Sequence, residues 1–164
     1  KAAFGAMGRL TPNYYLQDAT VPRTKLPETL SFVGELSREY RLRIANVFHA
    51  GDGNLHPLIL FDRYEKGAIE RVLNAGTDLL QYCVERGGTV SGEHGIGLEK
   101  KDYLTLIFSP DDLAAMAGLK RSFDPLMYFN PEKVFPTSFS CGEVAAIKES
   151  GVPVAGGLGL EDVV

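Results

Sequence analysis

Two of the three histidines in the chain, His49 and His56, flank the turn-forming sequence GDGN at residues 51–54. If these four residues form the turn of a β-hairpin, the two histidines stand directly opposite each other. Directly opposite side chains have Cβ atoms about 4.5–5.5 Å apart. Two imidazoles at that spacing can share one cation, with each nitrogen about 2.0–2.1 Å from a zinc ion. The apolar flanks predict that both rings point inward, where unpaired nitrogens are costly to bury.

A tight turn with incidental histidines is the alternative interpretation of this stretch. Glycine and asparagine accept positive φ angles, so GDGN is good turn chemistry by itself. The pair of histidines, together with a third histidine beside a carboxylate, favours a functional site over this alternative.

The third histidine, His94, follows Glu93 in the glycine-rich run GGTVSGEHGIG at residues 87–97. In extended backbone, adjacent side chains point to opposite sides, so these two residues can serve different purposes. Glu93 can supply a third metal ligand while His94 faces a substrate as a general base. Two histidines and one carboxylate leave coordination positions open, as catalytic metal sites do. The alternative is an irregular loop in which Glu93 is a solvated charge.

The elements that must position these residues are predicted from hydrophobic spacing and from turn and cap residues. Strands at 42–50 and 55–62 flank the GDGN turn. The other predicted elements are helices over 1–10, 26–40, 67–88, from about 98, and 110–123, and a strand over 14–22. This order predicts an α+β fold, in which an antiparallel sheet of ferredoxin-like type carries helices on one face.

Composition narrows the class of protein. The 164 residues are 45% hydrophobic and 23% charged, which is ordinary for one globular domain. A net charge of −4 without a basic run argues against nucleic acid as the partner. No apolar stretch approaches the roughly 20 residues of a transmembrane helix. Cys83 and Cys141 are far apart and lack a C-x-x-C pattern, so we predict a reducing, cytoplasmic location.

Three motifs carry a resemblance to a known family: HAGDGNLHP (49–57), GGTVSGEHGIGLEK (87–100) and FNPEKVFP (129–136). In this order they resemble the C-terminal region of FAD-linked 2-hydroxyacid oxidoreductases. That family includes the FAD-binding subunit of glycolate oxidase and the D-lactate and D-2-hydroxyglutarate dehydrogenases. The resemblance implies that residues 1–137 are the later part of the cap, or substrate, domain with the closing helices. Residues 138–164 are predicted to be a loosely ordered tail.

The resemblance also implies roles for individual residues. His49, His56 and Glu93 correspond to ligands of a divalent metal, such as zinc, iron or manganese. His94 corresponds to a catalytic base, and Asn130 to a residue near the flavin. The resemblance further implies that FAD itself is bound mainly by an N-terminal domain, which is not part of this sequence.

Two features of the sequence bear on how far the resemblance extends. Glu132 stands where the family usually has glycine, which places a charge where close packing against the flavin domain is expected. Leu16 and Leu58 stand where relatives that handle 2-hydroxyglutarate have polar residues. These leucines favour a small substrate such as glycolate or lactate.

The functional hypothesis is that the parent protein oxidises a small 2-hydroxy acid to the 2-oxo acid, with other oxidase subunits as partners. The chain alone is predicted to be inactive. Two other classes of function stay open. One is a metal-dependent hydrolase, because such a site could activate water without a flavin. The other is an inert metal-binding or interaction domain, whose uncovered apolar face would favour a homo-oligomer.

Overall fold

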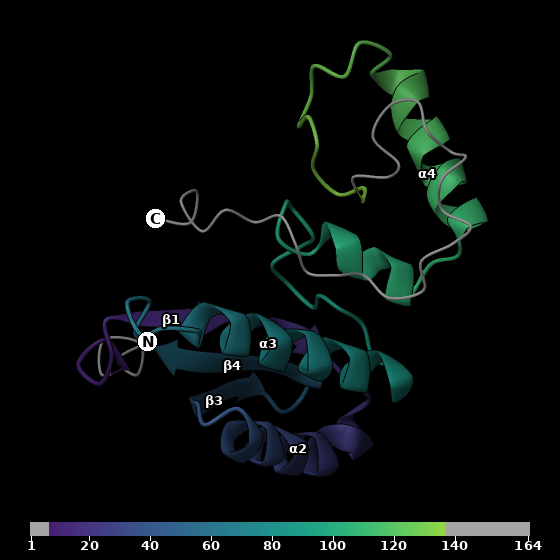
Figure 1. Ribbon diagram of the computed structural model, residues 1–164. Coiled ribbons are helices and arrows are strands. Elements are labelled where there is room, and N and C mark those ends of the chain that lie inside the picture. The colour runs from purple at the N-terminus through teal and green to yellow at the C-terminus, as the bar shows by residue number, and fades with distance from the viewer. Residues whose placement is uncertain (1–6, 137–164) are drawn as a thin grey trace. The chain divides into compact units, whose positions relative to one another are not determined.

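The computed structural model describes residues 7–136, which form two compact units, residues 7–94 and residues 95–136 (Figure 1). The helix predicted for residues 1–10 falls largely outside the described residues, and residues 8–10 form a turn. The predicted tail of residues 138–164 also lies outside them.

The first unit is built on a four-stranded antiparallel sheet centred on β4 (Asn54–Phe61). One edge of β4 pairs with β3 (Arg43–His49). The other edge pairs in succession with β1 (Asn13–Leu16) and β2 (Ala19–Thr20). The apolar run of β4 suits this central position, because every residue of the strand except Phe61 is buried.

The strand predicted over residues 14–22 is divided into β1 and β2, and Pro57 explains the division. Proline has no N–H, so β4 cannot offer a continuous ladder to its neighbour. The backbone N–H of Gln17 donates to the Pro57 carbonyl at 3.0 Å, and Pro57 has no donor to return. Both short strands keep one register against β4. Asp18, in the interruption, therefore lies opposite His56.

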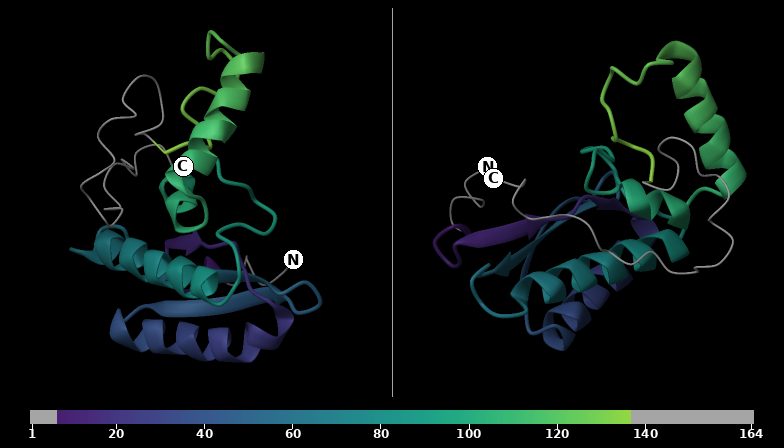
Figure 2. Two further views of the ribbon diagram at one scale, coloured as in Figure 1. Left: turned by 90° about the vertical axis from the view of Figure 1, so that its right-hand side faces the viewer. Right: turned by 45° about the horizontal axis from the view of Figure 1, so that its top comes forward.

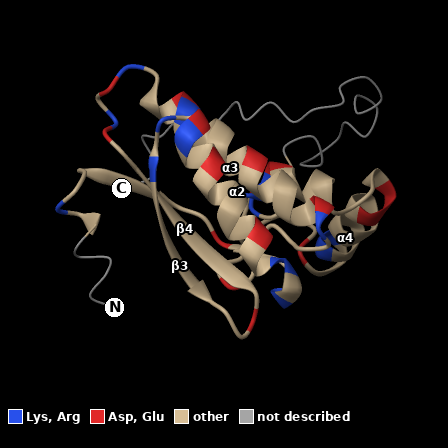
Figure 3. Ribbon diagram, turned by 90° about the horizontal axis from the view of Figure 1, so that it is seen from below, with Lys and Arg blue, Asp and Glu red and all other residues tan. Residues whose placement is uncertain are grey.

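Two amphipathic helices, α2 (Leu26–Glu39) and α3 (Ala68–Glu85), lie on the same side of β3 and β4 (Figure 3). Between them the rings of Phe32 and Tyr82 stack with centroids 3.8 Å apart. A short 3₁₀ helix, η1 (Arg23–Lys25), leads into α2. The predicted α+β fold, an antiparallel sheet with helices on one face, is confirmed.

The two faces of β4 have different neighbours. Ile59 packs with Val72 and Ala75 of α3, so its side of the sheet is the one that the helices cover. Successive side chains of a strand alternate between faces. His56 and Asn54 therefore point to the face opposite α2 and α3.

The second unit contains the 3₁₀ helix η2 (Lys101–Leu106), where a helix was predicted from about residue 98, and α4 (Pro110–Phe123). The predicted start of α4 at residue 110 is confirmed. The Ser109 hydroxyl accepts the Asp112 N–H, and the Asp112 carboxylate accepts the Ser109 N–H. This capping box satisfies two donors at the start of the helix.

After α4 the chain turns back within the second unit (Figure 2), and the Val134 N–H donates to the Gly97 carbonyl at 2.8 Å. Asp124 organises this turn, because its carboxylate accepts from Lys120 Nζ and from the backbone N–H groups of Tyr128 and Phe129. Burial alone would raise the pKa of Asp124. These hydrogen bonds and the Lys120 charge outweigh burial, so the pKa lies below its usual value.

The described helices carry charged residues of both signs, as helices on the surface of globular proteins do. Lysines and arginines are interspersed with acidic residues on α2 and α3 (Figure 3). Within residues 7–136, none of the helices combines the length and the apolar character needed to span a membrane.

Candidate metal centre

The β3–β4 hairpin brings His49 and His56 together with a register that differs from the predicted one. The turn occupies residues 50–53, one residue earlier than expected, and the His49 carbonyl closes it by accepting two backbone N–H groups at 3.0 Å. His49 therefore pairs with Asn54 and not with His56. The prediction that the two histidines stand directly opposite each other is wrong.

The two histidines nevertheless share one face of the sheet as diagonal neighbours. Diagonal positions lie about 7–8 Å apart, within reach of long side chains. The ring centroids of His49 and His56 are 5.4 Å apart, and the rings are nearly perpendicular. His56 is buried, as predicted, but the side chain of His49 is 53% exposed. The expectation that both rings point inward is thus correct only for His56.

Glu93 completes a three-residue cluster with the two histidines. Its Oε1 lies 3.5 Å from His49 Nε2, and its Oε2 lies 3.7 Å from His56 Nε2. One potential ligand atom from each residue lies within 4.8 Å of the other two. Two atoms bonded at about 2.0–2.1 Å to one tetrahedral ion are themselves about 3.3–3.4 Å apart. The cluster therefore has donor types and spacings that suit a divalent cation, with the exposed side open to solvent.

The neighbours of the His56 ring favour one of its two tautomers. The Asn54 amide nitrogen lies 3.4 Å from Nε2, and as a donor it requires a lone pair there. The carboxylate of Asp18 lies 3.8 Å from Nδ1 and favours the proton on that nitrogen. The lone pair of Nε2 then faces a Glu93 oxygen, which is also an acceptor. Two facing acceptors are unfavourable alone, and a shared cation removes the conflict.

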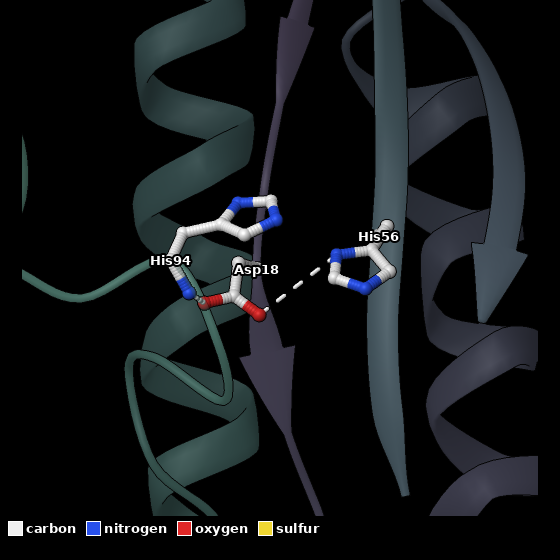
Figure 4. Close-up of side chains that lie close together, drawn as sticks. All are labelled: Asp18, His56 and His94. Atoms are coloured by element: carbon white, nitrogen blue, oxygen red, sulfur yellow. Dashed lines mark hydrogen bonds and ion pairs between the residues drawn. The ribbon is translucent and has the colours of Figure 1, made fainter. Parts of the chain in front are cut away.

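His94 lies beside this cluster. Its ring stacks on His56 with centroids 5.0 Å apart and an interplanar angle of 16° (Figure 4). Residues 92–94 form a bend and not extended backbone, so the predicted alternation does not describe them. Glu93 meets the Nε2 edge of His56, whereas His94 covers its face. Glu93 and His94 thus contact different parts of the same ring. His94 is exposed.

Asp18 is the residue of the cluster that the sequence predictions missed. Its side chain is fully buried, and its Oδ1 faces His56 (Figure 4). Its Oδ2 accepts hydrogen bonds from four consecutive residues: the Ser91 hydroxyl (2.7 Å) and the backbone N–H groups of Gly92 (3.0 Å), Glu93 (3.1 Å) and His94 (2.9 Å). An acidic residue within the apolar segment YYLQDAT was the available signal, because a buried carboxylate requires partners.

Gly92 lets the loop lie this close to the sheet. A Cβ at this position would stand 2.6 Å from Asn54 Oδ1 and closer still to Thr20 Oγ1. Any side chain would therefore push the backbone of residues 92–94 away from Asp18. The glycine serves the packing of the loop against β2 and β4.

Asn130 belongs to the second unit and is exposed there. It has a positive φ of 46°, and Glu132 has a φ of 61°. Glycine adopts such angles most easily, which gives a physical reason for the glycine that the resemblance places at position 132. The predicted contact between Asn130 and a flavin stays a prediction.

Comparison with known proteins gives the family. Residues 1–134 match the model of "FAD linked oxidases, C-terminal domain". Over 147 residues the chain is 48% identical to glycolate oxidase subunit GlcD of Escherichia coli (strain K12), covering 90% of this chain and 30% of that protein. It is 38% identical over 135 residues to GlcD of Bacillus subtilis (strain 168), covering 82% and 29%. It is 38% identical over 118 residues to a D-lactate dehydrogenase of Anaerostipes hadrus, covering 71% and 25%.

The chain therefore spans less than a third of the length of these relatives. The matched residues include the whole cluster, from Asp18 to His94, and the first part of the segment around Asn130. On this match, which covers most of its length, the chain belongs to the family of FAD-linked oxidases and corresponds to their C-terminal domain.

Proposed function

We propose that this chain is the C-terminal part of a flavin-dependent oxidoreductase that oxidises a small 2-hydroxy acid to the 2-oxo acid. Relatives named glycolate oxidase subunit and D-lactate dehydrogenase support this substrate class. The observation that carries the proposal is the convergence of His49, His56 and Glu93 on one point, with His94 beside them.

In this proposal His49, His56 and Glu93 hold a divalent cation, such as zinc, iron or manganese. His56 contributes Nε2, because its Nδ1 faces Asp18. A bound cation would supply Lewis-acid chemistry at the substrate oxygens, and FAD held by the rest of the parent protein would supply the hydride acceptor. The N-terminal FAD domain and other oxidase subunits are the proposed partners.

His94 is the proposed general base. Its ring lies against His56, so a proton acceptor stands next to the cluster. Its exposure leaves the ring nitrogens accessible to a substrate hydroxyl and to water, which must carry the proton away. A correctly placed base contributes about 10²–10⁴-fold to the rate of such a reaction.

The proposed preference for a small substrate rests on Leu16 and Leu58. These two residues pair with each other across β1 and β4. Both leucines lie on the same face of the sheet as His56, because Leu16 is two residues from Asp18 and Leu58 is two residues from His56. Two leucine side chains offer no partner for a second carboxylate, which favours glycolate or D-lactate over 2-hydroxyglutarate.

The test uses the full-length parent protein as wild type, as His94→Ala, and as the double variant His49→Ala with His56→Ala. We expect the wild type to show a flavin absorbance band, to contain a divalent metal by elemental analysis, and to oxidise glycolate or D-lactate. His94→Ala should lose about 10²–10⁴-fold in turnover while it keeps its flavin. The double variant should keep its flavin and lose the metal.

Each result has an outcome that would contradict the proposal. Wild-type turnover in His94→Ala would remove this residue from the mechanism. Equal metal content in the wild type and the double variant would remove the proposed ligands. A parent protein that binds no flavin and hydrolyses a substrate would support the metal-dependent hydrolase instead.

A further inference from the structure

We propose that Asp18 is a positioning residue of this site: it sets the affinity for the divalent cation by orienting both His56 and the main chain of residues 92–94. This inference rests on the proposed function, since it concerns the same cluster. Asp18 itself stays out of contact with the cation and the substrate.

The first observation is the number of groups that Asp18 orders. Its Oδ2 collects four hydrogen bonds from residues 91–94, between 2.7 and 3.1 Å. Hydrogen bonds to an ionised acceptor are shorter and about twice as strong as neutral ones. The N–H groups of Glu93 and His94 are both among the donors. A single buried carboxylate thus fixes the backbone from which both side chains project.

The second observation is the position of the other carboxylate oxygen. Oδ1 lies 3.8 Å from Nδ1 of His56, on the side of the ring away from Glu93. A carboxylate at this place favours the proton on Nδ1, so Nε2 carries the lone pair that a cation needs. The 3.8 Å separation is that of an electrostatic contact and is longer than a hydrogen bond. Replacement of a residue that hydrogen-bonds the second nitrogen of a metal-ligating histidine typically changes metal affinity or activity by 10–100-fold.

The third observation decides between two possible ligand sets that share His56. One set is His49, His56 and Glu93, and the other is Asp18, His56 and His94. Asp18 is unsuited to bind a cation, because it is fully buried and its Oδ2 is already occupied by four donors. The side chain of Glu93 is half exposed, and both its oxygens face histidine nitrogens. The geometry therefore assigns Glu93 to the cation and Asp18 to the support of the ligands.

The test measures zinc affinity in the flavin-bound, full-length parent protein after removal of its metal. Zinc is added alone and its binding is measured by competition with a chromophoric chelator. We compare wild type with Asp18→Asn, which keeps the shape of the side chain and removes its charge. Ser91→Ala removes one of the four hydrogen bonds and leaves the carboxylate. Asp78→Asn makes the same chemical change at a residue that bonds Tyr40, on the helix-covered side.

We expect Asp18→Asn to weaken zinc binding by about 10–100-fold. Ser91→Ala and Asp78→Asn should stay within about threefold of the wild type, because each removes a single hydrogen bond at most. Flavin content and the melting temperature are recorded for each variant. A purely structural role would lower the melting temperature of Asp18→Asn and leave the zinc affinity of the folded protein unchanged.

Zinc binding by Asp18→Asn that equals that of Asp78→Asn would overturn the role of Asp18 and leave the proposed function intact. A wild type that binds no zinc would overturn both. If Asp18→Asn fails to retain flavin, the tautomer of His56 in the wild type tests the proposed role of Asp18 instead. Nitrogen-15 spectra of labelled histidine, assigned with His56→Ala, should show the proton on Nδ1, and a proton on Nε2 would refute the inference.

Discussion

Gly92 lies where the loop of residues 91–94 crosses the sheet, and we predict that Gly92→Ala loosens the candidate metal centre. The added Cβ would stand 2.6 Å from Asn54 Oδ1. Asn54 is buried beside His56 and has little room to yield. Carbon–oxygen contacts are usually no shorter than about 3.3–3.6 Å, so the loop would have to retreat by roughly 0.7–1 Å.

The backbone N–H groups of residues 92–94 now donate hydrogen bonds to Asp18 with N···O distances of 2.9–3.1 Å. A retreat of this size lengthens these hydrogen bonds beyond useful length. Overpacking typically destabilises by about 1–3 kcal/mol, and the loss of a hydrogen bond to a charged group by about 1.5–3 kcal/mol. The two effects are alternatives, because the loop either stays strained or moves. We therefore expect a local loss of about 2–3 kcal/mol, equivalent to roughly 30–150-fold faster amide exchange at residues 92–94.

Hydrogen exchange with mass spectrometry on the full-length parent protein measures this effect in peptides that cover residues 89–97. Gly51→Ala is the matched control, because a Cβ there meets no atom within 4 Å and the substitution lies in the neighbouring hairpin turn. Equal exchange rates in Gly92→Ala and Gly51→Ala would refute the argument from close approach.

Two further predictions concern other parts of the chain. The hydrogen bond to the Asp78 carboxylate, burial and the nearby negative charge raise the pKa of Tyr40 from 10.0 to about 12. The folded state binds this proton more tightly than the unfolded state, so the stabilisation is complete below pH 10.0 and is lost as the pH rises towards about 12. Ultraviolet titration should show this late tyrosine in wild type, and Asp78→Asn should return it towards its ordinary pKa; an unchanged titration would contradict the assignment. Glu132→Gly should raise the free energy of unfolding by about 0.5–1 kcal/mol. A left-handed φ costs a side-chain-bearing residue about 1–2 kcal/mol, and the greater chain entropy of glycine offsets about half of that gain. A lower free energy of unfolding would show that the φ of 61° at this position carries no strain.

Helices α2, α3 and α4 could be predicted because their signals are local. The apolar spacing of α2 and α3 and the Ser109–Pro110 start of α4 lie within the segments that they describe, and the structure places the elements there. The interruption between β1 and β2 was not predicted. Its cause, Pro57, lies on a different strand.

The register of the hairpin could not be read from the turn sequence alone. Gly53 is buried against Val21, whose N–H donates to the Gly53 carbonyl at 3.0 Å, and a Cβ on Gly53 would collide with the Val21 carbonyl. This tertiary contact accompanies a turn at residues 50–53, one residue before the predicted one. Hydrophobic periodicity carries no information about such a contact.

The residues of the candidate metal centre could be predicted from the sequence, whereas Asp18 could not. His49, His56, Glu93 and His94 stand out by type, and the structure brings these four residues together. Asp18 acts across 74 residues of sequence on the backbone of Gly92, so nothing near Asp18 in the chain reports its partners. Its role depends on the strand pairing that puts it opposite His56.

Asp18 holds residues 92–94 by accepting hydrogen bonds from their backbone N–H groups, which every residue except proline provides. The path of the chain at positions 93 and 94 is thus separable from the side chains it carries. The backbone at these positions is fixed, while the side chains that offer ligand atoms can be replaced. Natural variation or laboratory selection could alter the chemistry of the cluster by single replacements at these two positions without rebuilding the domain.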